Sequence, residues 1–297
     1  MDPLPPTYTL ANARAAGLTR AHLRTGPFVR ISHDLVVRLD DAIDPRERLR
    51  VLATALPAGA AFSHGTAAHL LGAHLDLPAR PHVALTPRRV LPQRSDLVVH
   101  ARSLEPADVV EVDGLSATSG PQTFLDLAAV LPPPELVAVG DALLRAGHAT
   151  PESLRGRLAR AGRVRGVVRA RACAPLLSAA AMSRPESLVR FWLTDSHLPD
   201  PEVQVPVLDR HGRVVAHSDL GYRRWKLLLE YEGRQHADAD RFGADIDRYS
   251  LMAADGYLLL RFAARHLNAR TVVDRVERAL LSRGWRPTPP IAPIEPA

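Results

Sequence analysis

Residues 225–233 read WKLLLEYEG, and this stretch decides the fold of the last third of the chain. It is apolar until two acidic residues occupy its carboxyl end, which is typical of a buried strand that reaches a sheet edge. Side chains alternate along a strand, so Glu230 and Glu232 are predicted to point to one face. Two like charges on one face cost free energy unless a cation or a shifted pKa offsets their repulsion.

The elements expected around this strand follow the order α-β-β-β-α-β-α. Ser183 and Glu186 have the spacing of a capping box and open the first helix. The turn Asp209-Arg210-His211-Gly212 indicates a hairpin, and Asp219 lies near the end of its second strand. The remaining ranges are strands at Val203–Leu208, Val214–Leu220 and Tyr257–Phe262, and helices at Ala237–Asp255 and Thr271–Arg283.

The acidic residues on neighbouring strands predict a site for a hard divalent cation. Asp219 is expected on the strand beside Glu230, and carboxylate oxygens with retained waters are the ligands that Mg²⁺ or Mn²⁺ prefers. An exposed strand end with solvated acids is the alternative explanation of the same pattern.

This region resembles the very-short-patch-repair-like branch of the PD-(D/E)XK, or restriction-endonuclease-like, nuclease superfamily. The resemblance covers residues 183–284. It implies that Asp219 and Glu230 coordinate the metal, that the Tyr231 carbonyl joins them, and that Glu186 supports the site from the first helix. The residues that carry it are Glu186, Asp219, Glu230, Tyr231, Glu232, Gly233, His236, Asp245, Arg248, Gly256, Leu260, Arg261 and Phe262.

The lysine usual in that superfamily is absent, because position 232 is acidic here. Lys226 does not replace it, since six residues of extended strand place it roughly 20 Å from Glu232. Catalysis would then rely on the metal to activate water, with Glu232 or His236 positioning that water. His236 equally fits a helix-start residue.

Arg248 or Arg261 is expected to contact phosphate near this site. Asp245 and Arg248 are three residues apart and also fit an ion pair on one helix.

The amino-terminal residues 1–44 predict a small winged-helix unit. Two short helices precede the extended segments Phe28–Ile31 and Leu35–Val37, and the second helix would offer Arg20 and Arg24 to a DNA groove or to phosphates. A small interaction module that does not contact nucleic acid fits the same pattern.

Residues 45–177 are predicted to form a mixed α+β middle domain, followed by the restriction-endonuclease-like domain at 178–286 and a disordered tail at 287–297. The first 175 residues more weakly resemble abortive-infection antitoxin-like winged-helix proteins, through Phe28-Val29-Arg30, Ser63-His64-Gly65-Thr66-Ala67-Ala68 and the segment Thr118–Leu127. This second resemblance implies DNA binding. The overall fold class is therefore α/β.

Histidines at positions 64, 69 and 74 recur every five residues. That spacing rotates successive side chains on a helix by roughly 140°, so the three do not share a face and do not predict a metal site.

Composition favours a polyanionic partner and a cytoplasmic location. The net charge is +6 and the pI is about 10.2. No apolar run is long enough to span a bilayer and Met1-Asp2-Pro3 opens no signal peptide, so no membrane partner is expected. Cys173 is the only cysteine, which excludes an internal disulfide. Arginines crowd residues 155–171, which indicates either a phosphate-binding face or a solvated one.

Two hypotheses of function follow. The leading one is a Mg²⁺-dependent endonuclease, a hydrolase that cleaves DNA phosphodiesters in repair or phage defence, with RNA not excluded as substrate. The alternative is a non-catalytic, DNA-binding regulator of the toxin–antitoxin kind, in which the nuclease-like domain serves as a scaffold. The sequence indicates neither the cleavage site nor the oligomeric state.

Overall fold

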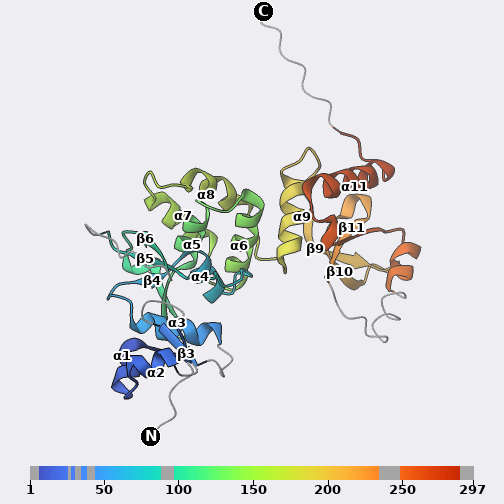
Figure 1. The fold of residues 1–297 in the computed structure, drawn as a ribbon. Helices are drawn as coiled ribbons and strands as arrows, with labels where there is room; N and C mark the ends of the chain where they lie inside the picture. The colour runs from blue at the N-terminus through green and yellow to red at the C-terminus, as the bar shows by residue number, and fades with distance from the viewer. Residues whose placement is uncertain are drawn as a thin grey trace, which may run out of the picture. The chain divides into compact units, whose positions relative to one another are not determined.

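The computed structural model describes residues 7–25, 28–30, 35–38, 44–87, 97–233 and 248–287. The chain divides into two compact units, one of residues 1–131 with 146–175 and the other of residues 132–145 with 176–297. Each unit contains its own mixed arrangement of helices and sheet (Figure 1). The expected disordered tail falls almost wholly outside the described residues. No helix in the described ranges has the length and apolar character needed to cross a membrane.

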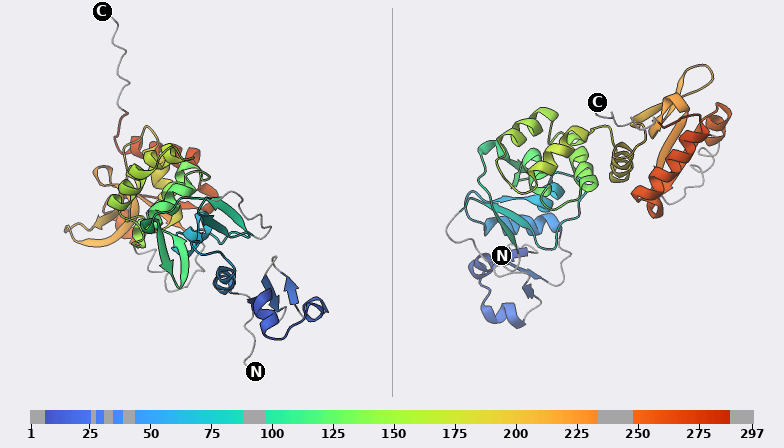
Figure 2. Two further views of the ribbon diagram at one scale, coloured as in Figure 1. Left: turned by 90° about the vertical axis from the view of Figure 1, so that its left-hand side faces the viewer. Right: turned by 90° about the horizontal axis from the view of Figure 1, so that it is seen from above.

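The first unit begins with two short helices and a small antiparallel sheet of order β1-β3-β2. Thr9 starts the first helix by accepting a 3.1 Å hydrogen bond from the Asn12 backbone amide. Ala13 and Val36 form the centre of its core. Figure 2 shows these elements in dark blue. They are β1 (Thr7–Thr9), α1 (Leu10–Ala15), α2 (Arg20–Thr25), β2 (Phe28–Arg30) and β3 (Leu35–Arg38).

The rest of the first unit is built on a five-stranded sheet of order β6-β5-β4-β8-β7. Its core joins Leu49 and Leu52 of α3 to Phe62 of β4 and Val83 of β5. The elements are α3 (Pro45–Thr54), β4 (Ala61–Phe62), α4 (His64–Leu70), β5 (His82–Leu85), β6 (Val98–Ala101), η1 (Pro106–Asp108), β7 (Val109–Val112), β8 (Leu115–Thr118), α5 (Gly120–Leu127), α7 (Pro151–Arg160) and α8 (Val167–Cys173).

The second unit is a four-stranded sheet of order β12-β11-β10-β9 between helices. Strands β9, β10 and β11 are antiparallel neighbours, and β12 runs parallel to β11. The elements are α6 (Pro133–Arg145), η2 (Ala174–Leu176) at the junction, α9 (Arg184–Thr194), β9 (Glu202–Leu208), β10 (Val214–Tyr222), η3 (Arg223–Trp225), β11 (Leu227–Glu232), a helical segment at 248–254, β12 (Leu258–Ala263), η4 (Ala264–His266) and α11 (Ala269–Ser282).

The leucines of β11 point alternately into two hydrophobic clusters of the second unit. Leu227 and Leu229 pack with Val189 of α9 and Val276 of α11, and α11 is drawn in red in Figure 1. Leu228 packs in a separate cluster with Met252 of the helical segment 248–254. The alternation that the sequence predicts is therefore what divides the core.

Three differences from the expected elements have local causes. β8 is not among the elements expected from the sequence, but it pairs with β7 and β4. β11 begins at Leu227 because Lys226 adopts a left-handed conformation, with φ of 47°. Of the helix expected at Ala237–Asp255, residues 234–247 lie outside the described part.

The middle domain expected at 45–177 loses α6 to the second unit. A buried ion pair accounts for this, since the Arg190 guanidinium of α9 lies 2.8 Å from the Asp141 carboxylate of α6. Asp141 also accepts a 2.7 Å hydrogen bond from the Ser178 amide. Both partners are nearly inaccessible, so removing either one would leave an uncompensated buried charge.

The arginine-rich stretch 155–171 serves largely to hold helices together. Arg157 contacts Gln122 and Asp108, and Arg160 contacts Asp108. Arg169 and Arg171 donate to backbone carbonyl groups, those of Ala128 and Leu131 and those of Leu158 and Ala161 respectively. A phosphate-binding face is therefore the weaker of the two interpretations of this cluster.

Two helical glycines of the first unit should respond to alanine in opposite ways. A Cβ atom at Gly120 would lie 2.2 Å from the His148 carbonyl oxygen, whereas at Gly156 it would meet no atom within 4 Å. We expect Gly120→Ala to lower the free energy of unfolding by about 1–3 kcal/mol, as overpacking does. We expect Gly156→Ala to raise it by about 0.5–1 kcal/mol. Urea unfolding of the full chain measures both, and equal effects would contradict the close approach at Gly120.

Candidate acidic site in the carboxyl-terminal unit

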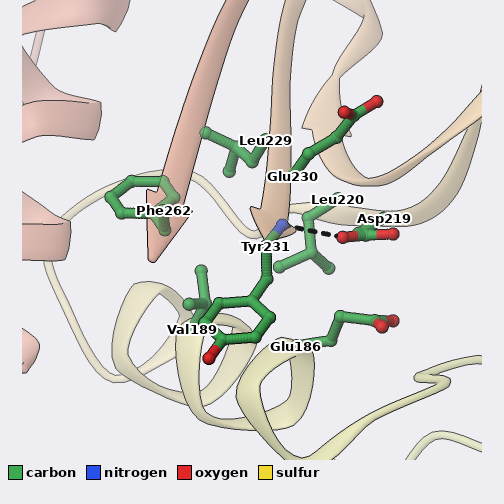
Figure 3. Close-up of a pocket in the computed structure, with 8 residues that line it drawn as sticks. All are labelled: Glu186, Val189, Asp219, Leu220, Leu229, Glu230, Tyr231 and Phe262. Carbon is green, nitrogen blue, oxygen red and sulfur yellow. Dashed lines mark hydrogen bonds between the residues drawn. The ribbon is translucent and has the colours of Figure 1, made fainter. Parts of the chain in front are cut away.

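Three acidic residues from three elements lie around one small pocket in the second unit. Glu186 comes from α9, Asp219 from β10 and Glu230 from β11. Figure 3 shows the three carboxylates turned to the same side, while the Tyr231 ring lies toward Val189. The other lining residues are Leu220, Leu229 and Phe262.

Asp219 is held where the pairing of β10 with β11 stops. The regular ladder ends at the pair Leu220 and Leu229. Beyond it, Asp219 Oδ2 accepts a 2.8 Å hydrogen bond from the Tyr231 amide, and Ser218 Oγ donates to the Leu229 carbonyl at 3.0 Å. Side chains thus replace backbone partners as the strands part, which leaves a gap between them for the pocket.

Glu186 is anchored at the start of α9. Its carboxylate accepts hydrogen bonds from the Met182 amide at 2.9 Å and from Ser183 Oγ at 2.8 Å. Ser183 is the N-cap, as its capping-box spacing predicted. These hydrogen bonds hold the Glu186 carboxylate beside the pocket. The charge of Asp219 contributes there to a raised pKa of Glu186.

Glu230 is almost fully buried and is paired with Arg248. The two guanidinium nitrogens lie 3.2 and 3.3 Å from the two carboxylate oxygens. Arg248 comes from the helical segment 248–254. This counterion offsets much of the cost of removing the Glu230 charge from water.

Burial raises the pKa of all three carboxyl groups. The charge of Asp219 raises the pKa of both Glu186 and Glu230 further, whereas Arg248 lowers that of Glu230 and of Asp219. Clustered carboxylates with raised pKa values are frequent at functional sites, where burial and neighbouring charges tune acids for chemistry.

Glu232 lies outside the pocket and is linked to Glu230 through Tyr249 and Arg248. It forms an ion pair with Arg261 and accepts a 3.2 Å hydrogen bond from the Tyr249 hydroxyl. The guanidinium groups of Arg248 and Arg261 lie 4.8 and 4.5 Å from the centre of the Tyr249 ring. Glu230 and Glu232 thus both contact residues 248–261, although the two serve different partners.

The structure brings together four of the predicted site residues, Glu186, Asp219, Glu230 and Tyr231. Arg248 and Arg261 are adjacent, but their contacts are with acids of β11 rather than with open surface. His236 and Asp245 lie outside the described residues, so their predicted roles stay predictions.

Lys226 lies at the far end of β11, where its ammonium group donates to the Asp255 carbonyl. It therefore does not reach the acids, as its spacing predicted. Tyr249 and Ser218 had no signal in the sequence, because their contacts depend on tertiary packing.

Arg20 and Arg24 are exposed on α2 of the first unit. They are four residues apart and so share one face of that helix. The Thr19 hydroxyl accepts from the His22 amide at 3.2 Å and starts the helix.

A comparison with known protein families finds a match in the middle of the chain. Residues 53–176 match the family model of the AbiEi antitoxin C-terminal domain. The predicted antitoxin-like resemblance is thus confirmed for the middle of the chain. The match contains neither residues 1–44 nor any residue of the acidic site.

Two relatives come from strains of Mycobacterium tuberculosis, the uncharacterized proteins MT2308 (strain CDC 1551 / Oshkosh) and Rv2248 (strain ATCC 25618 / H37Rv). Each is 29% identical over 197 residues, which are 66% of this chain and 71% of the relative. A crystal structure of the RV2827C protein from Mycobacterium tuberculosis aligns with a TM-score of 0.43 and 19% identity, over 62% of this chain and 75% of that chain.

Replacing Glu186 by glutamine separates its structural role from its electrostatic one. The amide oxygen of glutamine can still accept a hydrogen bond at the start of α9, so the free energy of unfolding should change by less than about 1 kcal/mol. If the carboxylate supports a cation, Mn²⁺ affinity should fall, as calorimetry would measure. Glu202→Gln, at an acid of β9 paired with Arg223, is the matched control. Equal Mn²⁺ affinity in wild type and both variants would leave Glu186 purely structural.

Proposed function

We propose that this chain is a DNA-binding regulator of the antitoxin-like kind. The observation that carries the proposal is the order of parts in the first unit. A pair of short helices and a β-hairpin at residues 7–38 precedes a domain whose residues 53–176 match an antitoxin domain. A helix pair followed by a hairpin is a common means of presenting a helix to duplex DNA.

The contact with DNA is assigned to α2. Its exposed Arg20 and Arg24 lie on one face, and guanidinium groups form bidentate contacts with phosphate. The net charge of +6 favours approach to a polyanion, although many arginines of residues 155–171 are engaged within the protein. The contact is therefore proposed for α2 rather than for that stretch.

The double substitution Arg20→Ala with Arg24→Ala should weaken DNA binding and flatten its salt dependence. Every arginine–phosphate contact that the substitutions remove should lower the slope of log K against log salt by about 0.9. The slope of the double variant should then fall by up to about 1.8, measured by fluorescence anisotropy on duplex DNA. Arg50→Ala with Arg155→Ala removes the same charge from exposed helix positions paired with Glu47 and Glu152, and should leave the slope nearly unchanged. An unchanged slope in the Arg20 and Arg24 variant would exclude α2 from the interface.

A second function is proposed for the acidic site, namely Mg²⁺- or Mn²⁺-dependent hydrolysis of phosphodiesters in DNA, with RNA as the other possible substrate class. The observation that favours it is the convergence of Glu186, Asp219 and Glu230 on one pocket. The order α-β-β-β-α-β-α and the residues of β11 also resemble the restriction-endonuclease-like class.

The donor atoms are oxygens, the type that a hard cation prefers. Asp219 and Glu230 would hold it, together with the Tyr231 carbonyl and water, because Mg²⁺ commonly takes one or two carboxylates and keeps several waters. When bound, the metal would polarise a phosphoryl oxygen and lower the pKa of a water. Arg248, now paired with Glu230, is then well placed to contact the phosphate. The Glu186 carboxylate, held by hydrogen bonds from the Met182 amide and the Ser183 hydroxyl, would add a negative charge nearby.

Asp219→Asn and Glu230→Gln should each abolish Mg²⁺-dependent cleavage and leave DNA binding intact or stronger. Each removes a ligand charge and relieves repulsion of phosphate. Added Mg²⁺ should raise the melting temperature of wild type more than that of either variant. Cleavage of a mixed DNA and RNA panel, with Glu202→Gln as control, measures the first effect.

If wild type cleaves nothing with Mg²⁺ or Mn²⁺, and neither ion shifts any melting temperature, the nuclease proposal is wrong. The DNA-binding proposal would stand unaffected, since it rests on the first unit.

A further inference from the structure

Three histidines that are distant in sequence meet in the first unit. His64 starts α4, His82 starts β5 and His100 lies within β6. One ring nitrogen of each lies within 4.8 Å of those of the other two. Among the described residues, this is the group of three side chains that is close enough to hold one metal ion together. It differs from the five-residue recurrence considered in the sequence, with which it shares only His64.

One pair of ring nitrogens, in His82 and His100, is spaced almost as a metal would space it. His100 Nε2 lies 3.0 Å from His82 Nδ1, and the rings of His64 and His100 are stacked with centres 3.7 Å apart. A tetrahedral zinc ion with Zn–N bonds of about 2.0–2.1 Å separates its ligand nitrogens by about 3.3 Å. Small rotations of the side chains would therefore suffice for His82 and His100 to share an ion.

The backbone fixes the relative positions of the three residues. In the parallel pairing of β5 with β6, Ala84 lies opposite His100, so His82 and His100 project from the same face of the sheet. The Ser63 amide donates to the His82 carbonyl at 2.9 Å, and the His82 amide donates to Thr66 Oγ1 at 2.9 Å. These two bonds tie the start of α4 to the start of β5 and so keep His64 beside His82.

The backbone of His64 is itself unusual, with a φ of 50°. Residues other than glycine adopt this left-handed conformation at a cost, and such strain is concentrated at sites where a side chain must be aimed.

An independent observation points to a ligand at this place. Asp126 Oδ2 is buried and accepts no hydrogen bond from the described residues, and it lies 3.9 Å from His64 Nδ1, which contacts Ser63 Oγ at 3.1 Å. The other oxygen, Oδ1, is satisfied by Arg102 and Gln122 at 2.8 and 3.0 Å. A buried carboxylate oxygen without a donor is costly. Histidines that bind metals usually donate their second ring N–H to a carboxylate, which fixes the ring.

We propose that His64, His82 and His100 form a binding site for a divalent transition-metal ion, with Zn²⁺ as the natural candidate and Asp126 as the group that orients His64. Three imidazoles suit zinc and its neighbours rather than Mg²⁺, which prefers oxygen. The site therefore differs in chemistry from the acidic pocket of the second unit. Three protein ligands leave a fourth position for water. His82 and His100 are only half-buried, which gives an ion a way in.

Co²⁺ is a suitable probe, because tetrahedral Co²⁺ absorbs visible light far more strongly than the hydrated ion. The full chain carrying Asp219→Asn, which weakens the acidic pocket as a competing site, would be freed of metal with a chelator and titrated with Co²⁺ and then with Zn²⁺. We expect one equivalent of Co²⁺ to give the tetrahedral spectrum and one equivalent of Zn²⁺ to abolish it.

Three variants in the same background test the ligands. His100→Gln keeps a polar side chain at a half-buried position, and should remove the tetrahedral spectrum. Asp126→Asn keeps the shape of the residue, and should weaken Zn²⁺ binding about 10–100-fold. His217→Ala, at an exposed histidine of β10, is the control and should bind as its parent does. Circular dichroism identifies any variant that does not fold.

The proposal would be overturned by either of two results. One is that the parent protein gives only the spectrum of hydrated Co²⁺ and binds no Zn²⁺ at micromolar concentration, in which case the histidines form a hydrogen-bonded part of the core. The other is that His100→Gln, while folded, binds Co²⁺ and Zn²⁺ as tightly as its parent does.

Discussion

The second unit depends on the alternation of side chains along β11. Leu227 and Leu229 enter the core shared with α9 and α11, while Leu228 enters the core under the helical segment 248–254. A shift of one residue would exchange the two faces and turn the charge of Glu230 toward the core of α9 and α11, so the register is strongly determined. Glu230 follows directly after the third leucine on the face of Leu228, and this register is what directs its carboxylate toward Arg248 of that segment.

A local departure from regular pairing turns that strand end into a site. Ser218 and Asp219 supply hydrogen bonds to the Leu229 carbonyl and the Tyr231 amide, where the backbone ladder has ended. The buried polar groups are thereby satisfied, yet the two strands part and leave the carboxylates beside a small hollow. Arg248 contacts Glu230 and Tyr249 contacts Glu232, both from the helical segment 248–254 that follows β11 in the chain.

Local patterns in the sequence were sufficient to predict the hairpin around Asp209, the helix opened by Ser183 and the strand that ends at Glu230. The nuclease resemblance, rather than these patterns, placed Glu186 in one predicted site with Asp219 and Glu230, and the three residues line one pocket. Other features depend on distant partners and had no local signal, such as β8 in its sheet and the pairing of Arg248 with Glu230. The meeting of His82 and His100 is of this kind, since it arises only from the pairing of β5 with β6. The arginines of 155–171 had the sequence pattern of a surface cluster, because nothing in a sequence indicates which backbone carbonyl groups will accept their hydrogen bonds.

The interleaved course of the chain has a consequence for how it folds during synthesis. Residues 132–145 belong with the carboxyl-terminal half, but residues 146–175 return to the amino-terminal half. During synthesis, α6 is made before Arg190 of α9, whose guanidinium neutralises the buried Asp141 carboxylate. The amino-terminal half is thus interrupted by a segment whose packing partners belong to the other unit and are made later. A fragment cut at any single point between residues 131 and 176 would divide one of the two units. Expression boundaries should therefore keep both segments of a unit together.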